Sequence, residues 1–115
     1  MFHKPFYFFL RAVLMIRELG PRVDEQSMKK ILEARERLAT WAEHSESNQR
    51  GRLCLVDAEL ARLEGKRERA MQLYDEAIGY AREYEHGAEE ALFNELAGRF
   101  WVDQGKDDFA QVYLV

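Results

Sequence analysis

The chain has 115 residues, of which 47% are hydrophobic and 33% are charged, so it is long enough for one compact domain and too apolar to remain disordered. Its net charge of -4 argues against nucleic acid as a partner, because that binding needs a basic face to displace counterions from phosphates. The single cysteine, Cys54, excludes an intramolecular disulfide and a cysteine-rich zinc site, and it fits a reducing cytoplasm.

The apolar opening MFHKPFYFFLRAVLMI predicts a buried helix rather than a targeting or membrane segment. Arg11 interrupts the apolar run, no small-residue cleavage site follows it, and the run is too short to span a bilayer. We expect the first helix from about Pro5 to Leu19, because proline suits a helix start and Gly20-Pro21 stops the helix.

The second and third helices are predicted on either side of the polar stretch SESNQRG. Asp24 is the expected cap of the second helix, whose apolar residues recur at three-and-four spacing up to about residue 45. Ser47 or Asn48 is the expected cap of the third. Gly65 should end that helix, because glycine adopts the left-handed conformation that many helix ends need.

Three further helices are expected at about 67 to 84, 88 to 104 and 107 to the end, with Gly105 closing the fifth and Asp107 capping the sixth. Small and large apolar residues alternate along the fourth, as closely packed antiparallel helices require. The small residues that we expect at close helix contacts are Ala58, Ala70 and Ala77.

The stretch LEGKRERAMQLYDEAI is echoed forty positions later by VDQGKDDFAQVYL. Laying Gly65 over Gly105 also places Ala70 on Ala110. A period of forty residues, each a helix, a glycine-centred turn and a second helix, is typical of a solenoid repeat. We therefore predict an all-α fold of stacked antiparallel hairpins in one domain over 1–115, with hairpins at about 5–46, 49–84 and 86–115.

These residues resemble the tetratricopeptide repeat, counted from Gly51 and again from Ala91. Cys54 and Asn94 stand where that family often has Trp, and six extra residues lengthen the standard unit. The positions that match the family are Ala58, Gly65, Ala70, Tyr74 and Ala77 in the first unit, and Gly98, Trp101, Gly105 and Ala110 in the second.

Over about residues 41 to 114, the chain resembles the repeat region of very large bacterial signalling proteins. The segments that carry this resemblance are WAEHSESN, LVDAELARLEGK, AMQLYDEAI and EEALFNELAGRFW. In that subgroup a kinase-like domain and a nucleotide-binding ATPase domain precede the repeats, and sensor, histidine kinase or other output domains follow them. The resemblance implies that this chain is a fragment of a longer array. Its end at QVYLV, partway through a helical pattern, agrees with that expectation.

No constellation of residues predicts catalysis, so we expect no enzyme, no cofactor and no metal. GRFWVDQGKDD is no phosphate loop, because six residues instead of four separate Gly98 from Gly105 and Asp107 replaces Ser or Thr. The histidines lack a second ligand at helical spacing, being about forty residues apart: His3, His44 and His86.

The resemblance implies that the first helix of each hairpin lines a concave face with its second, fifth, ninth and twelfth positions. For the charged members local ion pairing is the alternative, for instance Glu95 with Arg99 at i, i+4. The predicted binding positions are Arg52, Leu55, Glu59, Arg62, Leu92, Glu95, Arg99 and Val102.

We expect a protein-interaction and spacer module of a bacterial signal-transduction protein, without nucleic-acid binding or membrane insertion. The alternative is a regulatory binding domain that takes a peptide or small effector in its concave groove. The basic start and acidic end of the chain favour a homodimer that pairs one copy's first helix with the other's last. If the first helix instead folds back over its own second helix, a monomer is expected.

Overall fold

The computed structural model describes residues 4–44 and 46–114, which form helices and turns without any strand. The all-α prediction is therefore confirmed for this part of the chain. The helices are α1 (Lys4–Leu19), α2 (Glu25–His44), α3 (Glu46–Leu63), α4 (Arg67–Glu83), α5 (Gly87–Asp103) and α6 (Asp107–Leu114), with a short 3-10 helix, η1 (Gly20–Arg22), after the first.

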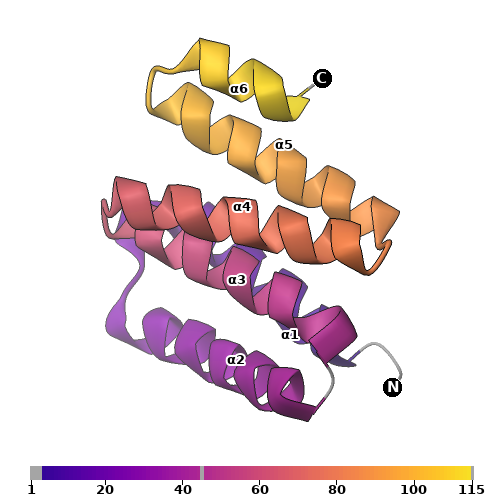
Figure 1. The fold of residues 1–115 in the computed structure, drawn as a ribbon. Coiled ribbons are helices and arrows are strands. Elements are labelled where there is room, and N and C mark those ends of the chain that lie inside the picture. The colour runs from indigo at the N-terminus through magenta and orange to yellow at the C-terminus, as the bar shows by residue number, and fades with distance from the viewer. Residues whose placement is uncertain (1–3, 45, 115) are drawn as a thin grey trace.

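Consecutive helices pack against one another from α1 to α6, which makes three antiparallel hairpins in a repeat-like stack. Figure 1 shows α2 to α6 as successive layers, with α1 behind α3. α1 contacts both α2 and α3, so the first helix folds back over its own second helix, which is the arrangement for which a monomer was expected, and it also covers the third. A contact between copies through α1 could therefore use only the outer face of this helix.

The turns that follow α3, α4 and α5 share one geometry at intervals of twenty residues. Each contains a residue with positive φ, namely Gly65 at 77°, Glu85 at 57° and Gly105 at 74°. The next residue donates its backbone N–H to the carbonyl five positions earlier, as in a Schellman motif. These bonds join Lys66 to Ala61 at 2.8 Å, His86 to Ala81 at 2.8 Å and Lys106 to Trp101 at 2.9 Å.

Of the three predicted helix caps, one is confirmed and two are wrong. Ser27 N–H donates to Asp24 Oδ1 at 2.7 Å, so Asp24 caps α2 as predicted. The predicted cap at Ser47 or Asn48 is wrong, because α3 already begins at residue 46. Asp107 is likewise the first residue of α6 instead of its cap. In the turn before α5 the left-handed residue is Glu85, and Gly87 is already the first residue of α5.

Small residues line the contact between α3 and α4. Ala58, Ala70 and Ala77 are fully buried. A Cβ added at Gly51 would lie 3.3 Å from the Cβ of Tyr80 and 3.4 Å from the carbonyl oxygen of Ala77. Glycine at this position therefore lets the two helices approach closely.

Replacing Glu85 by glycine should stabilise the protein. The left-handed conformation costs an L-residue about 1–2 kcal/mol, and the greater freedom of glycine in the unfolded chain offsets about 0.5–1 kcal/mol of the relief. Urea denaturation should show a gain of about 0.5–1 kcal/mol in the free energy of unfolding. Gln72→Gly, at an exposed position inside α4, is the matched control and should lose about 1 kcal/mol. A lower midpoint for Glu85→Gly would contradict the left-handed turn.

Two glycine-to-alanine substitutions should have opposite signs. Gly79 lies inside α4 with nothing within 4 Å of an added Cβ, so Gly79→Ala should gain about 1 kcal/mol from helix propensity. Gly51→Ala should instead lose about 1 kcal/mol, because overpacking at the α3–α4 contact outweighs the same propensity gain. Equal changes in the two unfolding midpoints would show that α3 and α4 are not in close contact at Gly51.

Candidate functional site

The eight predicted binding positions fall into two environments. Those on α3 lie beside α1: Leu55 and Glu59 are fully buried, and Arg52 and Arg62 are half-buried. Those on α5 lie largely at the surface: Leu92 is half-buried, and Glu95, Arg99 and Val102 are exposed. Only the α5 group therefore remains open to a partner.

Glu59 lies at the junction of three helices, and its side chain has 0% exposure. Its Oε2 accepts a hydrogen bond from Arg17 Nη2 of α1 at 2.9 Å and one from the Tyr74 hydroxyl of α4. Its Oε1 accepts a bond from Arg62 Nη2 of the same helix at 3.2 Å. One carboxylate thus joins α1 and α4 to α3.

The partners of Glu59 fit a buried carboxylate. An isolated ionised group in the interior is strongly unfavourable, and charge-assisted hydrogen bonds offset that penalty. Burial is the main cause that raises the pKa of Tyr74 above its usual value, and the nearby Glu59 carboxylate raises it further. The phenol therefore keeps its proton and donates it in the hydrogen bond to Glu59. Because the carboxylate is sealed from solvent and fully bonded, it holds the helices together and has no access to a substrate.

Aromatic rings and an ion pair extend the contact between α1 and the rest of the stack. The guanidinium of Arg52 lies 5.0 Å from the centre of the Phe6 ring, and it bonds both carboxylate oxygens of Glu89 at 2.9 and 2.7 Å. The rings of Phe9 and Phe93 are 5.9 Å apart. α1 therefore reaches α5 as well as α3, and it fills the α3 half of the predicted concave face.

The open half of that face carries a local ion pair. Arg99 Nη2 lies 3.0 Å from Glu95 Oε2, at i, i+4 on α5. Both side chains are exposed, and such pairs contribute little to stability. The α3 charges are paired as well, because Glu59 binds Arg62 at i, i+3. The α5 surface is therefore mixed in charge, and its exposed large apolar side chain is Val102.

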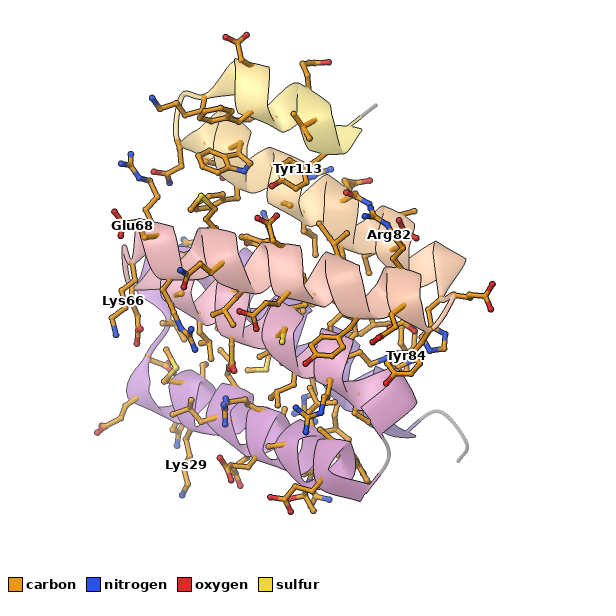
Figure 2. All side chains as sticks on the ribbon, in the orientation of Figure 1. Lys29, Lys66, Glu68, Arg82, Tyr84 and Tyr113 are labelled. Carbon is orange, nitrogen blue, oxygen red and sulfur yellow. The ribbon has the colours of Figure 1, made fainter. Side chains whose placement is uncertain are left out.

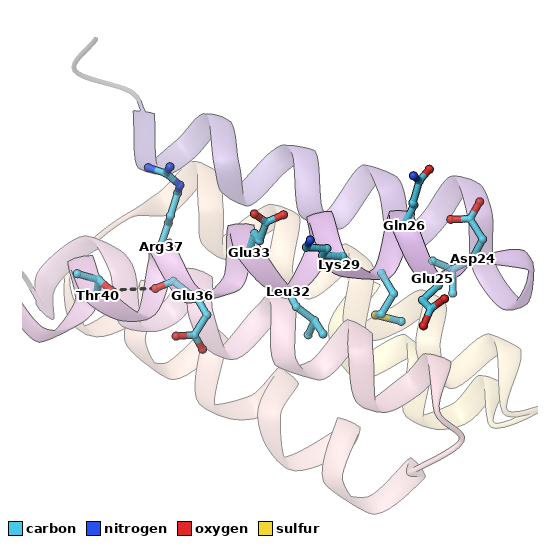
Figure 3. Close-up of a pocket in the computed structure, with 11 residues that line it drawn as sticks. Asp24, Glu25, Gln26, Lys29, Leu32, Glu33, Glu36, Arg37 and Thr40 are labelled. Carbon is cyan, nitrogen blue, oxygen red and sulfur yellow. Dashed lines mark hydrogen bonds between the residues drawn. The ribbon is translucent and has the colours of Figure 1, made fainter.

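Two hollows that the sequence did not suggest lie on other surfaces. The larger, about 1090 Å³, runs along the outer face of α2 beside Met28 and Leu32. Figure 3 shows that its lining comes from α2 and the residues just before it, so no second helix closes it. Leu32 is 45% exposed there, and the apolar spacing of the helix did not distinguish it from the buried residues of the same helix. Its open shape gives a ligand little to hold it.

The smaller hollow, about 320 Å³, lies between α4 and α6. Ile78 and Gly79 of α4 line it, together with Asn94 of α5 and Tyr113 of α6. The Tyr113 hydroxyl donates to Asp75 Oδ1 at 2.7 Å and so fixes α6 on α4. Figure 2 labels Tyr113 of α6 and Arg82 of α4, and Arg82 also lines this hollow.

The fold is all-α and helical-repeat-like, and its open surfaces lie on α2, on α5 and between α4 and α6. Among residues 4–44 and 46–114, no three His, Cys, Asp or Glu side chains gather as a metal site would require. In the same part of the chain, none of the helices has both the length and the apolar content needed to cross a bilayer. In comparisons with known proteins, no family model, no curated protein and no solved structure matches the chain.

Replacing Glu59 by glutamine should be strongly destabilising. The substitution leaves two guanidinium groups at the junction without their carboxylate, and breaking a buried pair typically costs about 3–5 kcal/mol. Glu95→Gln removes an exposed, locally paired carboxylate of α5 and should change the free energy of unfolding by less than about 1 kcal/mol. Urea denaturation of both variants checks the pair. Similar midpoints would place Glu59 outside the core.

Proposed function

We propose that the chain is a protein-interaction and spacer module of the tetratricopeptide type, belonging to a bacterial signal-transduction protein and without catalysis of its own. The observation that supports this most is the turn that recurs every twenty residues, at Gly65, Glu85 and Gly105. A recurring turn stacks hairpins at a fixed angle, as helical arrays that present surfaces to partners do. Glu59, one of the predicted binding positions, is fully buried and cannot meet a substrate.

The proposed mechanism is passive: stiff hairpins keep their two ends at a fixed separation. Polar bonds between neighbouring hairpins favour such stiffness, because bending at any junction would break at least one of them. Those bonds are Arg35 to Asp57 at 2.6 and 3.1 Å, Arg52 to Glu89 at 2.9 and 2.7 Å, Arg82 to Glu90 at 2.9 Å, and Tyr113 to Asp75 at 2.7 Å.

The second candidate is a regulatory domain that binds a peptide or small effector. The α4–α6 hollow favours it, since about 320 Å³ is near the lower limit for a small-molecule site. The concave face fits it less well, because α1 covers Leu55 and Glu59. An effector would therefore bind beside Gly79 and Tyr113 instead of at the eight predicted positions.

Distance measurements between the two ends of the stack test the spacer proposal. Fluorophores on Leu32→Cys and Val112→Cys, in a Cys54→Ser background, should give one narrow distance distribution, because both positions are exposed on hairpins that the polar bonds hold in place. Arg52→Ala removes the bond to Glu89 and should broaden the distribution.

Glu95→Ala is the matched control, because the bond that it removes lies within α5. It should leave the distribution unchanged. A broad distribution in the chain without Arg52→Ala would overturn the spacer. A distribution that only narrows when a peptide or metabolite is added would favour the effector domain instead.

A further inference from the structure

α1 carries apolar side chains on both of its faces. Its inner face packs into the core, whereas on its outer face Tyr7 is 56% exposed and Leu14 is 53% exposed. Soluble helices normally have a polar outer face, and a helix that is apolar all round is normally covered all round. The buried residues of the inner face are Phe9, Ala12, Val13 and Ile16.

Two charged residues complete the outer face of α1. Tyr7, Arg11, Leu14 and Glu18 follow one another at spacings of four, three and four, so they form one stripe along the helix. We call these four residues the outer stripe. Arg11 and Glu18 are exposed, and neither has an ion-pair partner among the residues that the structure describes.

We infer that the outer stripe is a contact between two copies of this chain, with the two α1 helices antiparallel across a two-fold axis. An antiparallel pair centred between Leu14 and Met15 brings Arg11 of each copy opposite Glu18 of the other, since both lie about one helical turn from the centre. The symmetry forms this ion pair twice. Leu14 then lies beside the axis, where contact with the second copy removes it from water.

Charge favours this pairing over contact between α1 and α6. The apolar side chains at the other end of the stack, Phe109 at 51% and Val112 at 75% exposure, have the exposed acid Asp108 beside them. Against α6, only Arg11 of the two stripe charges would face an opposite charge, whereas α1 of a second copy offers an opposite charge to both Arg11 and Glu18. Arg17, counted in the basic start of the chain, is already bonded to Glu59.

The size of the contact sets its strength. α1 has 16 residues and is therefore about 24 Å long. A single pair of such helices buries less surface than the roughly 1,200–2,000 Å² of a standard stable interface. The copies should accordingly exchange between monomer and dimer as protein concentration changes.

Light scattering across a dilution series of the full chain, from about 10 μM to about 1 mM, measures this exchange. The average mass should rise from 13.6 kDa towards twice that value, and Leu14→Glu should abolish the rise. Leu32→Glu, at a position with 45% exposure on α2, is the matched control and should leave the rise unchanged. A mass constant at 13.6 kDa, or a rise that survives Leu14→Glu, overturns the proposal.

Charge exchange tests the antiparallel geometry. Arg11→Glu and Glu18→Arg should each weaken association, because each places like charges opposite one another. In an equimolar mixture of the two variants, opposite charges face each other at both places, so the mixture should associate roughly 3- to 10-fold more tightly than either variant alone. A mixture no tighter than its components would overturn the antiparallel contact. Circular dichroism checks that each variant is folded.

Discussion

The carboxylate of Glu59 fixes the position of α1 on the stack. It is fully buried and accepts bonds from Arg17, Arg62 and Tyr74, so α1, α3 and α4 share a single acceptor. Removing α1 would expose this charge and leave Tyr74 and Arg62 as its only partners. Because breaking a buried pair is much less favourable than losing an exposed one, α1 is a permanent part of the core and no displaceable lid over α3.

The position of α1 explains why two equivalent repeat positions differ in chemistry. Leu55 and Glu59 of α3 correspond, forty residues later, to Glu95 and Arg99 of α5. The first pair is buried under α1, whereas the second faces solvent. An apolar side chain and a bonded carboxylate suit a covered site, and a charged i, i+4 pair suits an open one. One repeat pattern therefore produces an interior junction on α3 and a surface on α5.

The sequence predicted the helices and two of the turns, but it could not predict how far α1 extends over the stack. Gly65 and Gly105 indicated their turns in the sequence, because few other residues favour positive φ. Glu85 takes the same conformation without any such signal, since glutamate is common anywhere on a helix surface. Glu59 was predicted among the binding positions of an open concave face. Its burial depends on Arg17, forty-two residues earlier, and no local pattern records a contact of that range.

Covering the α3 half of the concave face changes where a partner can bind. In an open array the first helices of the hairpins would share one groove, but here α1 fills that groove beside Leu55 and Glu59. The inner face of α1 therefore packs in the core of its own chain, and that packing does not explain Tyr7 and Leu14 on the opposite face. Apolar side chains in water lower solubility and add nothing to the core. Their presence is accounted for if two copies of the chain recognise each other through the outer face of α1, opposite the face that fills the groove.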